Sequence, residues 1–186
     1  MSKARMLVVA LIVLVGGVVA FAVHSLTAKD IAMPQVGQQA PTFVLPSQDG
    51  TQISLDSFKG KWVVLYFYPK DMSSGCTLEA HNFQRDQDKF TKQNAVIVGI
   101  SVDTAESHKQ FCTKENLTFR LLADPSAGAV IAYGSLASLG PLKIAKRNTF
   151  LIDPTGKIVK VWTGVKSQTH SQEVVAELAT VEQKGM

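Results

Sequence analysis

Two cysteines, Cys76 and Cys112, are the residues of this 186-residue chain best suited to covalent chemistry. Cys76 ends a small polar loop, Lys70 to Gly75, which itself follows an apolar run from Trp62 to Tyr68. If a helix begins at Cys76, the thiol faces unpaired N–H groups and a positive partial charge, which favour the nucleophilic thiolate. The loop therefore predicts a reactive cysteine.

The flanking segments explain how such a cysteine would be positioned. The apolar run before the loop is short and rich in β-branched and aromatic residues, which predicts a strand buried on both faces. Beyond the cysteine, apolar residues recur at roughly helical spacing at Leu78, Ala80, Phe83 and Phe90. Cys76 is thus expected between the end of a strand and the start of a helix, which is where ligands and catalytic groups commonly lie in α/β proteins.

The alternative for the two cysteines is one structural disulfide, which an oxidising compartment would favour. Two observations weigh against it: the loop around Cys76 is polar, and a chain of this length can bury a core without a cross-link. The residues alone leave both interpretations open.

Pro69, Ser73 and Cys76 form the pattern P-x-x-x-S-x-x-C, within FYPKDMSSGCTLEAHNF. This stretch resembles the active-site signature of peroxiredoxins, in particular the bacterioferritin-comigratory-protein (Q-type) branch of the AhpC/TSA thiol peroxidases. The resemblance covers roughly Pro34 to the C-terminus. It implies a thioredoxin-like fold and a thioredoxin-dependent peroxidase that reduces hydrogen peroxide and organic hydroperoxides with no metal or organic cofactor.

The resemblance also assigns roles to residues. It makes Cys76 the peroxidatic nucleophile and Arg147 the guanidinium that contacts both the thiolate and the peroxide. It implies that Ser73 hydrogen-bonds the peroxide and that Pro69 shields the sulfur from water. Ser73 stands where the family usually has Thr, and Ser74 stands where this branch usually has Pro. Glu79 matches the branch's C-T-x-E, although it also suits a helix's first turn.

A second thiol must convert the sulfenic acid of Cys76 into a disulfide. Many members of the branch carry it five positions after the first cysteine, where this chain has His81. The branch's other arrangement, a resolving cysteine on the following helix, implies Cys112 and an intramolecular disulfide recycled by a thioredoxin-like donor. We expect local unwinding around both cysteines on oxidation, because a disulfide needs Cα atoms within about 7 Å.

The remaining patterns predict an α/β fold with a central mixed β-sheet flanked by helices on both faces. Expected strands and helices alternate, and a Pro-x-Gly turn joins a terminal hairpin. The expected strands are Thr42–Leu45, Thr51–Leu55, Ala95–Val102, Thr118–Ala123, Arg147–Asp153 and Lys157–Thr163. The expected helices are Thr104–Asn116, Ala127–Tyr133 and Ser171–Gln183, with a loop at Gly134–Pro141.

The N-terminus predicts a membrane segment. Residues 6–23 carry no charge and follow Lys3 and Arg5, so we expect a signal anchor in 1–28, a tether in 29–39 and the catalytic domain in 40–186. The catalytic domain would then lie outside the cytoplasm, on the periplasmic side. If Ala20-Phe21-Ala22 is a processing site, the protein would be periplasmic or secreted.

Charge and motifs narrow the other functions. Without Lys3 and Arg5 the basic residues fall from 19 to 17 against 15 acidic ones, so no nucleic-acid partner is expected. The runner-up is an anchored extracytoplasmic thiol–disulfide oxidoreductase, but the chain has no C-x-x-C. It also lacks the C-x-x-x-C of a copper-delivery module, and its four histidines have no metal-ligand spacing. A purely structural or binding module would leave the chemistry of the loop around Cys76 unexplained. As to oligomeric state, we expect a monomer.

Overall fold

A five-stranded mixed sheet forms the centre of the computed structural model, which describes residues 32–139 and 142–183. The strand order is β5-β4-β3-β8-β9. Strands β3, β4 and β5 run parallel, whereas β8 pairs antiparallel with both β3 and β9. Their bounds are β3 Trp62–Phe67, β4 Ala95–Ser101, β5 Arg120–Ala123, β8 Asn148–Ile152 and β9 Ile158–Thr163.

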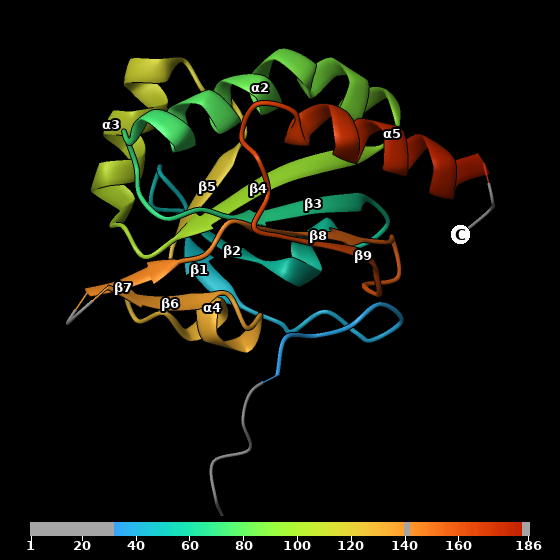
Figure 1. Cartoon of the computed structure of the whole chain (residues 1–186), viewed down its shortest axis with the longest axis horizontal. Coiled ribbons are helices and arrows are strands. Elements are labelled where there is room, and N and C mark those ends of the chain that lie inside the picture. Colours follow the sequence, from blue (N-terminus) through green and yellow to red (C-terminus); the bar gives the residue numbers. More distant parts are fainter. Residues whose placement is uncertain (1–31, 140–141, 184–186) are drawn as a thin grey trace, which may run out of the picture. The chain divides into compact units, whose positions relative to one another are not determined.

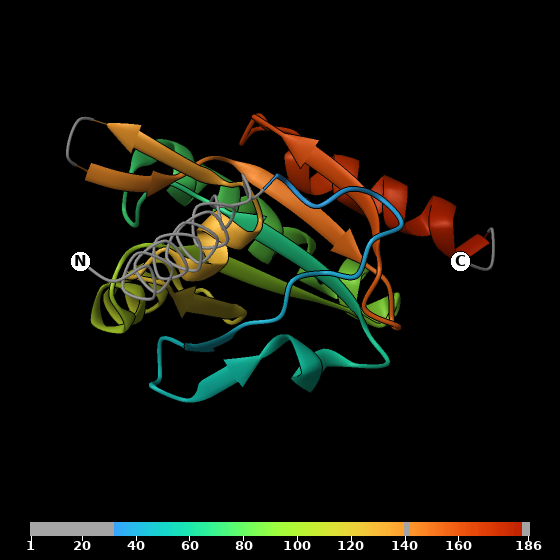
Figure 2. The ribbon, with the colours of Figure 1, turned by 90° about the horizontal axis from the view of Figure 1, so that it is seen from below.

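Helices cover both faces of this sheet (Figures 1 and 2). One face carries α2 (Ser74–Lys92), α3 (Ala105–Glu115) and α5 (His170–Gln183). The other carries the short helix α4 (Gly128–Ala132) and the hairpin of β1 (Val44–Pro46) and β2 (Gln52–Ser54), which leads into the 3₁₀ turn η1 (Leu55–Phe58). A second hairpin joins β6 (Leu136–Leu139) and β7 (Leu142–Ala145).

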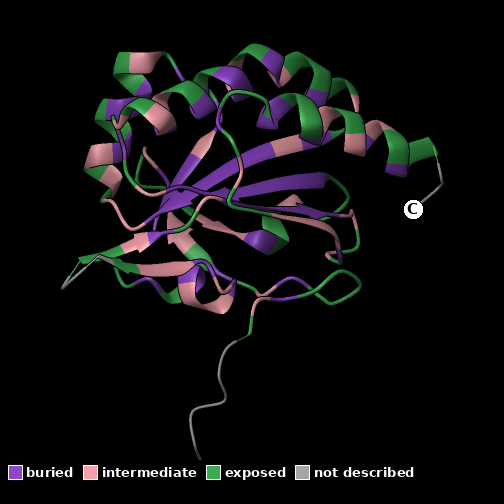
Figure 3. Ribbon diagram, in the orientation of Figure 1, coloured by how far each residue is buried: buried purple, intermediate pink, exposed green. Residues whose placement is uncertain are grey.

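Strand β3 divides the hydrophobic core into two parts. Every residue of this strand is buried, as the purple central strands in Figure 3 show. Because side chains alternate along a strand, Trp62, Val64 and Tyr66 pack beneath α2, α3 and α5. Val63 and Phe67 pack on the opposite face, towards α4 and the first hairpin. This explains why the strand shows an unbroken apolar run in the sequence.

The α/β prediction, with a mixed sheet between helices, is confirmed, and so is the terminal hairpin, in β8 and β9. The segment Gly134–Pro141 was expected to be a loop, but it contains strand β6. Its partner β7 lies in a stretch for which no strand was predicted. These two strands form a two-stranded sheet of their own, so they are defined by their pairing with each other.

The membrane prediction needs correction. Across residues 32–139 and 142–183, none of the helices combines the length and apolar character needed to cross a membrane. Residues 6–23, on which the anchor was predicted, lie outside the described residues. We therefore withdraw the predicted membrane anchor and the predicted location outside the cytoplasm, for which relatives give no support either, as described below.

Gly99 provides a test of the packing beneath the helices. It pairs with Tyr66 across β3 and β4, and a Cβ at Gly99 would lie 2.8 Å from the Tyr66 ring and 2.6 Å from Leu121 Cδ2. Gly99→Ala should lower the free energy of unfolding by about 1–3 kcal/mol, because the buried ring cannot move away without strain. Urea denaturation measures this.

Gly128→Ala is the matched control, because its Cβ would meet nothing closer than Ser126 Oγ at 3.5 Å. Equal losses of stability in the two variants would contradict the predicted clash.

Candidate active site

The register between β3 and β8 brings Cys76 and Arg147 to the same end of the sheet. The loop to α2 leaves β3 after Phe67, and Phe67 pairs with Asn148, the first residue of the antiparallel strand β8. Arg147 therefore lies immediately before β8, at the end of the sheet where β3 ends. It is nevertheless 71 positions from Cys76 in the chain. An arginine at this point can reach the start of α2.

Helix periodicity determines where the Cys76 side chain points. Ser73 is the N-cap of α2, so Cys76 lies in the first helical turn. Cys76 is the first residue of a buried stripe along α2 that continues through Ala80 and Phe83 and packs into the core. Cys76 itself is only 2% exposed. Leu78, which was expected on this stripe, points away and is 39% exposed. The thiol is thus oriented by the same period that packs the helix.

Arg147 contacts both functional groups on this stripe. Its Nη2 donates to Cys76 Sγ at 3.1 Å, and its Nη1 donates to a carboxyl oxygen of Glu79, one turn further along α2. The approach depends on Gly75, since a Cβ there would lie 2.9 Å from Arg147 Nη2. Gly75 is a site residue that the sequence alone did not reveal, because only the position of the guanidinium shows the need for a glycine.

Glu79 is a buried acid with an altered titration. Its residue is 1% exposed, and burial raises its pKa to about 7 although the charge and hydrogen bond of Arg147 lower it. Among the described residues, its second oxygen, Oε1, is buried without a hydrogen-bond partner. Glu79 lies beyond the first turn of α2, so its side chain is held by Arg147 and does not act as an acid of the first helical turn.

Ser73 and Pro69 lie in the loop that precedes the thiol. Ser73 is half-buried, and its hydroxyl donates to the carbonyl oxygen of Lys70 at 3.0 Å. Pro69 is half-buried and comes just after β3 and Tyr68. The hydroxyl oxygen of Ser73 therefore retains lone pairs that can accept a hydrogen bond from a bound molecule.

Cys112 lies on α3, in the same core cluster as Cys76. Both cysteines are free thiols, and the Cys112 residue is 8% exposed. Burial, followed by the negative charge of Asp71, raises the pKa of Cys112 to about 12. In this fold Cys112 is therefore protonated at neutral pH, while Cys76 is the cysteine that faces a guanidinium.

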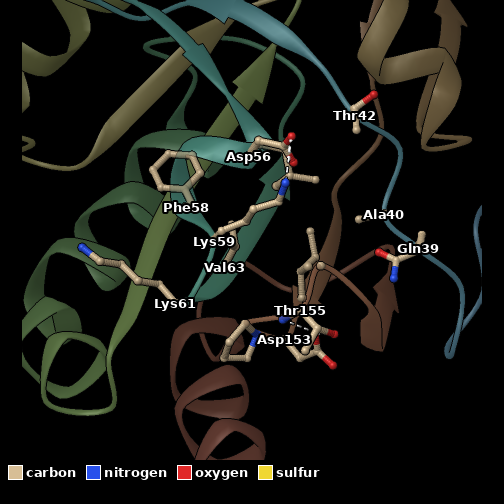
Figure 4. A pocket seen from close by; sticks show the side chains of 14 residues that line it. Gln39, Ala40, Thr42, Asp56, Phe58, Lys59, Lys61, Val63, Asp153 and Thr155 are labelled. Atoms are coloured by element: carbon tan, nitrogen blue, oxygen red, sulfur yellow. Dashed lines mark hydrogen bonds and ion pairs between the residues drawn. The ribbon is translucent and has the colours of Figure 1, made fainter.

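A pocket of 390 Å³ lies elsewhere (Figure 4). Its lining includes Lys59 and Lys61 from the segment before β3, Val63 from the start of β3, and Asp153 and Thr155 from beyond the end of β8. These residues lie at the opposite end of the sheet from Cys76, because β3 enters there and β8 leaves. The pocket is separate from the candidate site.

Comparison with known proteins gives a family for this arrangement. The model of the AhpC/TSA family matches residues 36–161. Peroxiredoxin Bcp of Bacillus subtilis is 39% identical over 154 residues, which cover 81% of this chain and 98% of that protein. Peroxiredoxin Bcp of Xanthomonas campestris is 39% identical over 146 residues, which cover 75% of this chain and 91% of that protein.

Solved structures agree. PrxQ of Xylella fastidiosa superposes with a TM-score of 0.77 at 31% identity, covering 81% of this chain and 99% of that chain. The bacterioferritin comigratory protein of Xanthomonas campestris, described with alkyl peroxide reduction activity, gives 0.73 at 32% identity, covering 78% of this chain and 98% of that chain. These matches confirm the thioredoxin-like fold. The Bcp relatives are matched along nearly their whole length, which leaves the predicted anchor without a counterpart in them.

The titration of Glu79 predicts a pH-dependent stability. Its pKa is about 7 in the folded protein, against 4.5 as the ordinary value. Between these values the folded protein keeps a proton that the unfolded chain has lost, so raising the pH favours unfolding. The free energy of unfolding of the wild type, minus that of Glu79→Gln, should fall from about pH 4.5 to about pH 7 and then level off.

Urea denaturation across this pH range measures the difference. Glu182→Gln, on the exposed side of α5, controls for the loss of one carboxyl group. A difference that rises with pH would mean that Arg147 outweighs burial at Glu79.

Proposed function

The chain belongs to the AhpC/TSA family as a thiol peroxidase of the peroxiredoxin Bcp/Q branch, and on this premise we propose that Cys76 is its peroxidatic nucleophile. The observation that carries the proposal is the hydrogen bond of 3.1 Å from Arg147 Nη2 to Cys76 Sγ. A guanidinium at this distance stabilises a thiolate, and the first turn of α2 adds its positive partial charge.

In the first step the Cys76 thiolate attacks one oxygen of a hydroperoxide. The S–O bond forms as the O–O bond breaks, and the other oxygen leaves as hydroxide or alkoxide and takes a proton. Sulfur is oxidised to the sulfenic acid, and the peroxide is reduced to water or an alcohol. Arg147 suits this step because it can follow the negative charge from sulfur to the leaving oxygen.

Ser73 and Pro69 complete the proposed site. With its proton donated to the Lys70 carbonyl, the Ser73 oxygen can accept a hydrogen bond from the hydroperoxide O–H. Pro69 fixes the chain at the end of β3 and limits access of water to the sulfur. We propose hydrogen peroxide and organic hydroperoxides as substrates, since the Xanthomonas campestris relative is described with alkyl peroxide reduction.

Cys112 is proposed to resolve the sulfenic acid. Its sulfur attacks the Cys76 sulfur, the S–S bond forms, the S–O bond breaks, and water leaves. Both residues are buried on helices, so we expect this step to proceed through local unwinding, which would also expose Cys112 and ease its ionisation. A thioredoxin-like dithiol would then reduce the disulfide and become oxidised itself.

Two cysteine substitutions test these assignments. Cys76→Ser should abolish peroxide consumption, because it removes the nucleophile. Cys112→Ser should consume about one equivalent and then turn over poorly with thioredoxin as donor, because the sulfenic acid is not resolved. Peroxide consumption and intact-protein mass report both results, and full activity of Cys76→Ser would rule out the assignment.

Arg147→Gln should lower the second-order rate constant for peroxide by roughly 100-fold to 1,000-fold, the loss typical of one transition-state donor. Single-turnover kinetics in the Glu79→Gln background measure it without leaving a buried carboxylate unpaired. Arg120→Gln is the control, because Arg120 is a partly exposed arginine that pairs with Asp49. Equal rates for Arg147→Gln and the control would contradict the role of the guanidinium.

A further inference from the structure

A buried polar cluster joins the loop before α2 to the start of α3. Asp71, in that loop, accepts a hydrogen bond from Tyr68 Oη at 2.7 Å and one from Ser107 Oγ at 2.7 Å. His108 Nδ1 lies 2.8 Å from Asp71 Oδ2. Asp71 is 6% exposed and His108 is fully buried. These contacts hold the loop on α3 through a carboxyl group that is out of reach of most solvent.

The cluster lies beside both cysteines along the chain. Asp71 comes five residues before Cys76, and His108 comes four residues before Cys112. Positions four apart on a helix lie one above the other, so His108 and Cys112 share the buried face of α3. Hydrogen bonds between Asp71 and α3 therefore connect the two segments that carry the two thiols.

We propose that Asp71, Ser107 and His108 act as a latch, a set of positioning residues that hold the Cys76 loop on α3 and limit how fast the disulfide with Cys112 forms. The inference rests on the proposed resolving role of Cys112. In the resolving step proposed above, both helical segments unwind, and an unwound α3 cannot keep Ser107 and His108 on the Asp71 carboxylate. The latch must therefore break before the disulfide forms.

Two local features make this latch releasable. Met72, the residue after Asp71, has a positive φ of 57°, a backbone conformation that is unfavourable for residues other than glycine. In the described part of the chain, His108 Nε2 is buried without a hydrogen-bond partner, and water can satisfy it once α3 opens. Opening relieves both, whereas the Asp71 contacts oppose it.

A second contact, between α2 and α3, is weaker. His81 Nε2 on α2 lies 2.9 Å from Glu115 Oε2 on α3, but the His81 side chain is 50% exposed. Pairs in contact with solvent contribute little to stability. The buried Asp71 cluster is therefore the connection whose loss should change the opening rate most.

The latch would set the lifetime of the sulfenic acid. While the latch is closed, the Cys76 sulfenic acid cannot react with Cys112 and remains available to a second hydroperoxide. That peroxide would transfer one oxygen to sulfur, giving a sulfinic acid and an alcohol or water. A weaker latch should therefore favour the disulfide, and a tighter one should favour over-oxidation.

Ser107→Ala in the full chain tests the latch with a small change. It removes one hydrogen bond to Asp71 and leaves intact the backbone N–H of residue 107, which donates to the N-cap oxygen, Thr104 Oγ1. Ser126→Ala is the matched control: it removes a 3.0 Å hydrogen bond from an exposed serine to the buried Asp124, on the other side of the sheet.

Stopped-flow mixing with one equivalent of hydrogen peroxide, quenched for mass spectrometry, separates sulfenic acid formation from disulfide formation. Ser107→Ala should form the disulfide about threefold to tenfold faster, as one lost hydrogen bond allows, with the first step unchanged. It should also yield less sulfinic acid in excess peroxide, while Ser126→Ala matches the wild type. His108→Gln should accelerate the same step further.

Three results would overturn the proposal. Disulfide formation at the wild-type rate in both Ser107→Ala and His108→Gln would remove the latch and leave the resolving role of Cys112 intact. A slower step would show instead that the cluster guides Cys76 towards Cys112. Peroxide turnover by the wild type without a Cys76–Cys112 disulfide would overturn the resolving role and the latch together.

Discussion

The guanidinium of Arg147 is the interaction on which the candidate site depends. It donates to the Cys76 sulfur and to a carboxyl oxygen of Glu79 at the same time, and both acceptors are buried. Burial removes the hydration of a thiolate and of a carboxylate, and without a fixed cation nothing would offset that loss or their mutual repulsion. The fork of an arginine suits this position because its two arms can hold two acceptors at once.

The rest of the fold serves to bring that cation to that helix. The antiparallel pairing of β3 with β8 places the start of β8 beside the end of β3, and Gly75 leaves room for the arginine. The parallel pairing of β3 with β4 places α2 and α3, and therefore both cysteines, on one face of the sheet. A mixed sheet is thus required, since neither pairing alone would assemble the site.

The proposed chemistry asks two opposite things of the same segments. Attack on a peroxide needs the first turn of α2 to be folded, because the helix end and Arg147 act on the sulfur only in that geometry. Resolution needs the same turn to unwind so that Cys76 can meet Cys112. Buried contacts such as those of Asp71 stabilise the first state, and the strained backbone at Met72 favours the second.

The sequence by itself determined the central strand, the helix whose first turn carries the cysteine and the α/β class, because these follow from local periodicity and from a loop of distinctive composition. Through a family resemblance it also indicated Arg147, but it misjudged the N-terminal segment and missed strands β6 and β7, whose short segments are defined by pairing. Only the tertiary structure decided the contacts of Gly75, Glu79 and the Asp71–His108 cluster. The physical reason is that each depends on residues 36 to 72 positions away in the chain, and only the sheet register brings such residues together.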